Sequence, residues 1–164
     1  MGFRLFCFLV SRHVRSHMDP QREKMLVAIK ERVVPALRDL GFRGSFPHFR
    51  RIGSTQMDLL SFQFYSSGGR FVVEIAKCPP GGIVAGWGKE IPPSKLNVTY
   101  FRERFRLGSD PSTGEVDHWY EFGKRSYEAG HQEVKADAFY RQVAEKVVSD
   151  LVTQAVPWWG SPAA

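Results

Sequence analysis

The amino-acid sequence predicts a single α+β domain in which an antiparallel sheet of about five strands packs against an N-terminal and a C-terminal helix. Two observations support this class. Residues 56–76 alternate between apolar and polar side chains with a period of two, which is typical of β-strands. Residues 20–40 and 135–155 repeat apolar side chains at three- and four-residue steps, which is typical of amphipathic helices. The expected order of elements is α-β-β-β-β-β-α.

The segment 56–76 is expected to form a hairpin, because Gly68-Gly69 separates two alternating runs and glycine reaches the positive φ angles that hairpin turns need. One face carries the apolar side chains Leu60, Phe62, Phe64, Phe71, Val73 and Ile75. The opposite face carries Ser61, Gln63 and Tyr65. We expect the two helices to cover the apolar face. The polar face should stay open to solvent, and it is the first place where we expect a binding surface.

The first helix has clear signals at both ends. Asp19 is a typical N-cap, and Pro20 suits the first helical position, where its missing N–H costs nothing. Gly41 followed by Phe42 is typical of a C-cap with its hydrophobic contact. Pro35 lies inside the pattern, so we expect a kink or a break just before it.

The closing helix is expected over residues 135–155 and should stop before Pro157. Beyond it, the pair Trp158-Trp159 is expected to fold back onto the core, and a role in contacting a partner is the less favoured interpretation.

The chain termini are expected to lie outside the fold. Residues 1–18 are interpreted as a leader, residues 19–158 as the domain and residues 159–164 as a flexible tail. The apolar run of the leader is too short to cross a bilayer, and no secretory cleavage signal follows it. His13 and His17 are spaced to share a helix face, but no third ligand accompanies them, so we expect no metal site.

The overall charge is basic, with a formal net charge of +6, but three of these charges come from arginines in the leader. The remaining domain is only mildly basic, which gives weak support to nucleic-acid binding. Cys7 and Cys78 form no metal-binding or redox spacing and suit a reducing cytoplasm. We therefore expect a cytoplasmic protein without a transmembrane segment, a cofactor or a metal.

Residues 78–96 form a long expected loop that holds four of the ten prolines. Loops of this length are often functional. The run Gly-Trp-Gly-Lys at 86–89 superficially resembles a phosphate-binding loop, but Ile83 and Glu90 occupy positions that require Gly and Ser or Thr. Trp87 is expected either to plug the sheet edge, which we favour, or to recognise a partner.

Three more strands are expected, over residues 46–52, 97–107 and 119–122. In the second of these, one face carries Tyr100, Arg102, Arg104 and Arg106. Such a stripe can engage phosphates or carboxylates. The favoured alternative is a solvated face with cross-strand partners such as Glu74 or Glu121. Glu103 is expected either among the aromatic side chains of the other face or in water at the end of the sheet.

The order of several short motifs resembles a known family. The motifs are Leu37-Arg-Asp-Leu-Gly-Phe-Arg43, Phe49-Arg-Arg51, Leu60-Ser-Phe-Gln63, Arg106-Leu-Gly108 and Trp119 before the last helix. Over about residues 19–158 the chain resembles the bacterial family described as domain of unknown function 4304. The resemblance implies an α+β domain in a bacterial cytoplasm, and it brings no catalytic residues with it.

We expect a non-enzymatic binding module that meets a protein partner through the open sheet face and the long loop. The candidate binding residues are Gln63, Trp87, Tyr100, Arg102, Arg104, Arg106 and Trp119. An alternative is a nucleic-acid-binding domain in which the three arginines act with aromatic stacking. A third hypothesis, an enzyme that uses the carboxylate of Glu103 or Glu74, would require a raised pKa inside a cleft. No catalytic residue is assigned.

Overall fold

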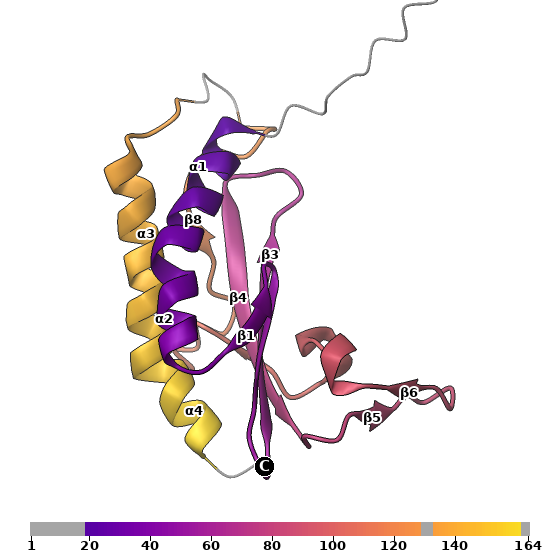
Figure 1. Cartoon of the computed structure of the whole chain (residues 1–164). Coiled ribbons are helices and arrows are strands. Elements are labelled where there is room, and N and C mark those ends of the chain that lie inside the picture. The colour runs from indigo at the N-terminus through magenta and orange to yellow at the C-terminus, as the bar shows by residue number, and fades with distance from the viewer. Residues whose placement is uncertain (1–18, 129–132, 162–164) are drawn as a thin grey trace, which may run out of the picture.

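The computed structural model describes residues 19–128 and 133–161, so the interpretation of residues 1–18 as a leader, with His13 and His17, lies outside the described residues. Two long helical segments lie side by side on one face of an antiparallel sheet (Figure 1). The α+β class predicted from the sequence is confirmed.

The first helical segment is continuous through Pro35. It comprises α1 (Pro20–Ala28), a π-helical turn (Ile29–Val33) and α2 (Val34–Asp39). Proline has no N–H, and its ring clashes with a carbonyl one turn earlier. In the wider π turn the Val34 N–H donates to the Ile29 carbonyl. This turn lets the helix continue through Pro35. The expected kink or break is therefore replaced by a π turn.

Both ends of this segment follow the prediction. Asp19 caps the start, because its Oδ1 accepts the N–H of Gln21 at 3.0 Å. At the other end Gly41 adopts a φ of 85°, and the Phe42 N–H donates to the Leu37 carbonyl at 2.9 Å. The chain then turns into the sheet.

The closing helical segment also contains a π-helical turn just before a proline. It comprises α3 (Asp137–Asp150), a π-helical turn (Leu151–Ala155) and α4 (Val156–Gly160). The Val156 N–H donates to the Leu151 carbonyl immediately before Pro157. The expected helix end before Pro157 is wrong, because the π turn again accommodates the proline.

The main sheet has the order β1-β2-β3-β4-β7, and β8 also pairs with β4. Its strands are β1 (Arg43–Ser45), β2 (His48–Ile52), β3 (Met57–Phe64), β4 (Arg70–Cys78), β7 (Phe105–Arg106) and β8 (Tyr120–Glu121). A separate pair consists of β5 (Ile83–Val84) and β6 (Glu90–Ile91). The expected strand over 46–52 is confirmed as β2 but begins only at His48, because Phe46 and Pro47 form the turn between β1 and β2, which contains the cis peptide bond before Pro47.

The central hairpin of β3 and β4 is confirmed. Leu60 pairs with Ile75 and Phe62 with Val73, so the aromatic and aliphatic side chains share one face. Gly69 has a φ of 75°, and a Cβ there would lie 2.7 Å from the Gly123 carbonyl oxygen. Both facts require glycine at this turn.

The helices bury the apolar face of the sheet, as predicted. Buried side chains from all layers meet in one core, among them Met25, Ile29, Leu37, Phe49, Phe62, Phe71, Val73, Phe122, Val147 and Leu151. Trp159 of α4 is also buried in this core, which confirms that the tryptophan pair folds back.

The expected strand over 97–107 is mostly wrong. Asn97 accepts the N–H of Thr99 at 2.9 Å and caps a 3-10 helix (Val98–Tyr100), so a side chain competes successfully with strand pairing. A second 3-10 helix precedes it (Pro93–Lys95). Phe101 packs on the face of the sheet away from the helices.

That opposite face, termed here the second face, is only partly open. The loop after β4 covers one half of it and forms a second apolar cluster. The buried members are Met57, Leu59, Ala76 and Cys78 from the sheet with Ala85, Ile91, Leu96 and Val98 from the loop. The expectation of a fully open polar face is corrected, and only the half around Ser61 and Gln63, termed the open half, remains for a site.

Candidate functional site

A line of polar side chains crosses the open half. His48 pairs with Ser61, Ser61 with Glu74 and Glu74 with Arg106, on the adjacent strands β2, β3, β4 and β7. Paired residues of antiparallel strands point to the same face. The four residues therefore form one continuous row, termed the polar row, on the side away from the helices.

The first pair in the polar row is hydrogen-bonded. The Oγ of Ser61 lies 2.8 Å from Nδ1 of His48, and Ser61 is buried. Burial, followed by the positive charge of Arg50, lowers the pKa of His48 below its usual value of 6.5. The imidazole is therefore neutral at pH 7, with one nitrogen occupied by Ser61.

The other end of the polar row is an ion-pair network. The carboxylate of Glu74 lies 3.3 Å from Arg106 and 3.6 Å from Arg104. Arg106 also pairs with Asp117. The predicted cross-strand partnership of the arginines with Glu74 is thus confirmed, and two of the three stripe arginines are already engaged by acids.

Arginine and aromatic side chains stack beside the polar row. The guanidinium of Arg70 lies 4.5 Å from the Tyr65 ring centroid and 4.2 Å from that of Trp119. Arg106 lies 5.4 Å from the Trp119 ring. Such cation–π contacts each contribute roughly 0.5–2 kcal/mol, depending on desolvation. Trp119 is therefore held in place as part of the open half.

A pocket of about 360 Å³ opens at one end of the polar row. His48, Ser61, Gln63 and Glu74 line it from the sheet, and Arg22 lines it from α1. Its apolar lining comes from both sides of the sheet, with Phe46 packed against the core under the helices and Val98 in the second apolar cluster. The pocket thus combines hydrogen-bonding groups with an apolar lining, as small-molecule sites do.

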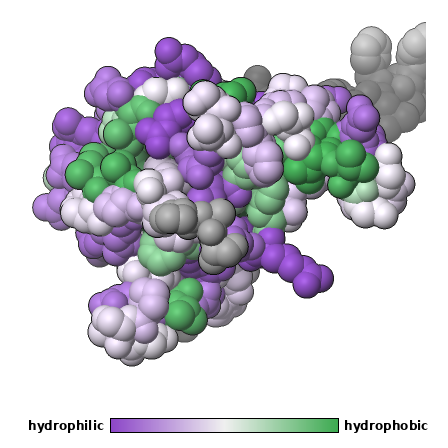
Figure 2. Space-filling model, turned by 90° about the horizontal axis from the view of Figure 1, so that it is seen from below, coloured by the Kyte–Doolittle hydropathy of each residue, from purple (hydrophilic) through white to green (hydrophobic). Residues whose placement is uncertain are grey.

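Trp87 lies on a projecting arm, defined as residues 83–91 with the strands β5 and β6 (Figure 1). The Ala85 N–H donates to the Lys89 carbonyl at 2.8 Å and closes the turn, in which Gly88 has a φ of 82°. Trp87 is 73% exposed and Val84 is 68% exposed. Figure 2 shows a group of hydrophobic residues on this side of the surface and others on the opposite side. The favoured interpretation of Trp87 as a plug is wrong, because the arm carries it away from the sheet edge.

The structure brings together only some of the predicted site residues. Gln63, Arg104, Arg106 and Trp119 lie on or beside the open half, whereas Tyr100 and Arg102 are exposed around the 3-10 helix and Trp87 is on the arm. The pairing of His48 with Ser61 was not predicted from the sequence. The short turn at Gly53 sets the register between β2 and β3, and it is the feature of the sequence from which this pairing could have been predicted.

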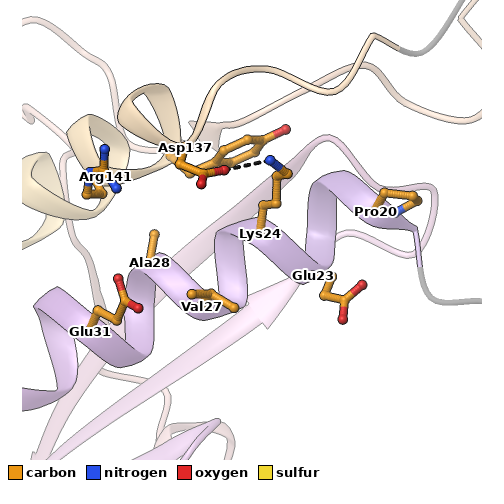
Figure 3. A pocket seen from close by; sticks show the side chains of 9 residues that line it. Pro20, Glu23, Lys24, Val27, Ala28, Glu31, Asp137 and Arg141 are labelled. Carbon is orange, nitrogen blue, oxygen red and sulfur yellow. Dashed lines mark hydrogen bonds and ion pairs between the residues drawn. The ribbon is translucent and has the colours of Figure 1, made fainter.

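A second hollow lies between α1 and α3 (Figure 3). It has a volume of about 420 Å³ and is crossed by the ion pair of Lys24 with Asp137 at 2.5 Å. Asp137 is largely exposed and Lys24 partly so, and the hydrogen bond and charge of Lys24 lower the pKa of Asp137. Glu23, Glu31 and Arg141 are further charged residues at this hollow. We interpret it as a solvated seam between helices, since surface ion pairs of this kind are common.

Neither of the two carboxylates proposed for an enzymatic centre, Glu103 and Glu74, lies alone in an apolar cleft. Glu103 is exposed, which confirms the expected alternative of a carboxylate in water. Glu74 is held by two arginines instead of standing alone in an apolar cleft. Within residues 19–128 and 133–161, no cluster of three or more His, Cys, Asp or Glu side chains is suited to hold a metal ion.

These features define a small α+β domain with two helices on one face of the sheet, and a polar row and a projecting arm on the other. The model of the family described as domain of unknown function DUF4304 matches residues 33–161, and the chain belongs to this family. No curated protein and no solved structure is significantly similar to the chain. Of the helices in the described part of the chain, none has both the length and the apolar character that a membrane crossing requires.

Proposed function

We propose that this protein is a non-enzymatic binding module of the bacterial cytoplasm that meets a protein partner through the arm and the open half. The observation that carries the proposal is the exposure of Trp87 at the turn of the arm. Burying a tryptophan side chain is favourable, because it removes a large apolar surface from water. A partner that covers the exposed Trp87 would therefore gain binding free energy.

The arm is built to present this side chain. Ile83, Ala85 and Ile91 pack into the second apolar cluster, which fixes the base of the arm on the sheet. Trp87 is then held outward on a short, hydrogen-bonded turn. Aromatic residues in such a position are frequent centres of binding energy, and a pre-ordered element loses little entropy on binding.

Nucleic-acid binding is the second candidate, but the geometry favours it less. Arg104 and Arg106 are paired with Glu74, and Arg102 does not share a strand face with them. A phosphate backbone would have to compete with these carboxylates. A contact made through phosphates would also weaken steeply with salt, whereas one based on Trp87 would not.

Replacing Trp87 by alanine should abolish capture of the partner without affecting the fold. The measurement is affinity capture from nuclease-treated lysate in low and high salt, and separate site-specific photo-crosslinking from position 84 in cells identifies the protein that contacts the arm. Truncation of a central interface tryptophan commonly costs at least about 2 kcal/mol, or roughly 30-fold in affinity. Tyr127→Ala is the matched control, because Tyr127 is 62% exposed and lies outside the arm.

Two results would contradict the proposal. One is a crosslinked protein that binds Trp87→Ala and the unmodified chain equally well. The other is a captured species that disappears with nuclease or high salt, which would instead favour the nucleic-acid candidate.

A further inference from the structure

Arg70, on the open half, has no acidic partner in the described part of the chain. Its side chain forms no ion pair there, and its buried Nε has no hydrogen-bond partner. Glu121 lies opposite Arg70 in the pairing of β4 with β8, but the two side chains form no ion pair. By contrast, Arg106 on the same face is held by Glu74 and Asp117. The position of the Arg70 guanidinium therefore does not depend on an acid.

Two aromatic rings hold this guanidinium instead. The rings of Tyr65 and Trp119 lie 5.6 Å apart at an angle of 78°, and the guanidinium of Arg70 lies within 4.5 Å of both ring centroids. The backbone fixes the same neighbours, because the Tyr65 N–H donates to the Arg70 carbonyl at 3.0 Å. All three side chains are partly exposed. A guanidinium held in this way keeps the N–H donors of its planar fork for an acceptor, and because it is already ordered it loses little entropy on binding.

The charges around this cluster favour a single carboxylate as the acceptor. Arg104 and Arg106 are balanced by Glu74 and Asp117, and Arg70 is left without such a partner. A nucleic-acid backbone gains its affinity from several cations that neutralise successive phosphates. One carboxylate, in contrast, matches one guanidinium and can accept two parallel hydrogen bonds from it. The neighbouring rings add apolar surface on which the atoms beside a carboxylate can pack.

We propose that Arg70 binds an acidic side chain of the protein partner. The carboxylate accepts hydrogen bonds from the two Nη groups, because Nε is buried. The apolar atoms next to it pack on the rings of Tyr65 and Trp119. This inference rests on the proposed function, in which the open half faces the partner, and it adds the chemistry of that contact.

Titration of the ¹⁵N-labelled protein with two blocked peptides, followed by two-dimensional NMR, tests this assignment. The probes are acetyl-Leu-Glu-Leu-amide and its uncharged counterpart acetyl-Leu-Gln-Leu-amide. The glutamate peptide should shift the indole N–H resonance of Trp119 and the amide resonance of Tyr65. It should bind at least about tenfold more tightly than the glutamine peptide, because a hydrogen bond between charged groups contributes more than a neutral one.

Arg70→Gln should weaken binding of the glutamate peptide by at least about tenfold. The matched control is Arg32→Gln, which removes the same charge from an exposed position of the first helical segment and should leave binding unchanged. Arg70→Lys keeps the charge but loses the planar fork, so it should bind with intermediate affinity. It also provides a second variant if Arg70→Gln alters the circular dichroism spectrum. Trp87→Ala should leave the titration unchanged, so loss of partner capture and loss of peptide binding are separate results.

The assignment is overturned if the glutamate peptide shifts neither resonance at millimolar concentration, or if the glutamine peptide binds equally well. It is also overturned if the correctly folded Arg70 variants bind like the unmodified protein. A deoxythymidine oligonucleotide that shifts the same resonances at lower concentration than the glutamate peptide would instead assign this position to nucleic acid.

Discussion

Replacing Trp159 by alanine should lower the free energy of unfolding by about 3–5 kcal/mol, as expected for removal of a buried tryptophan. Trp159 is only 3% exposed, and its ring centroid lies 4.9 Å from that of Phe42. Its Nε1–H donates to the Ala76 carbonyl oxygen at 3.2 Å. The substitution therefore leaves a cavity and also removes the donor from a buried carbonyl, and both effects destabilise the native state.

Urea-induced unfolding followed by far-ultraviolet circular dichroism measures this loss without relying on tryptophan fluorescence. Trp87→Ala is the matched control, because the same truncation at a 73% exposed position should change stability by less than about 0.5 kcal/mol. Trp159→Phe should fall between the two, since it keeps one aromatic ring in the core but loses the rest of the indole and its N–H donor. Equal stabilities of Trp159→Ala and Trp87→Ala would show that α4 does not close the core.

The contrast between these two tryptophans shows what the sequence could predict. Trp159 follows an amphipathic helix, and the periodicity of that helix already directs the chain end toward the core. The orientation of Trp87 depends instead on how β5 and β6 pack on Met57 and Leu59. That contact joins segments far apart in the chain, and no local pattern fixes it.

Local signals predicted some elements correctly, but one local signal was overlooked. The hairpin at Gly68-Gly69 and the cap at Asp19 depend on neighbouring residues, and both were predicted correctly. The strand expected over 97–107 is mostly wrong, because Asn97 stabilises a 3-10 helix there. The alternation of polar and apolar side chains does not indicate this helix. The apolar character of Met57 and Leu59, on the side of Ser61, was a visible sign that the second face is partly covered.

The candidate site was only partly predictable for a related reason. Gln63 and Arg106 were predicted as candidates because they lie on polar strand faces. The polar row, however, requires the register of four strands, and a shift of one residue would move every side chain to the other face. His48 stood alone in the sequence and acquires a partner only when β2 is placed against β3.

Replacing Tyr120 by phenylalanine should cost about 1–3 kcal/mol, because it leaves a buried carboxylate without one of its donors. The Tyr120 hydroxyl donates to Oδ2 of Asp150 at 2.7 Å, and both residues are buried. Lys146 pairs with the other carboxylate oxygen. This contact joins β8 to α3, so it ties the edge of the sheet to the helix that covers it.

A double-mutant cycle of Tyr120→Phe and Asp150→Ala isolates the contact from the loss of each side chain. The coupling energy should be about 0.5–3 kcal/mol, as found for hydrogen-bonded neighbours. Additive effects of the two substitutions would mean that the hydrogen bond contributes nothing. Tyr127→Phe is the control for removing a tyrosine hydroxyl, because Tyr127 is exposed and its hydroxyl should have little effect on stability.

The same contact predicts how stability depends on alkaline pH. Burial, followed by the hydrogen bond and the charge of Asp150, raises the pKa of Tyr120 above its usual value of 10. Above pH 10 the unfolded chain therefore releases the Tyr120 proton while the native state retains it. Because the native state then binds more protons, its stability falls as the pH rises, and this part of the loss should be absent from Tyr120→Phe. Unfolding curves at pH 8 and above pH 10 measure the difference. Parallel losses in the two proteins would show that the Tyr120 hydroxyl ionises as readily in the native state as in the unfolded chain.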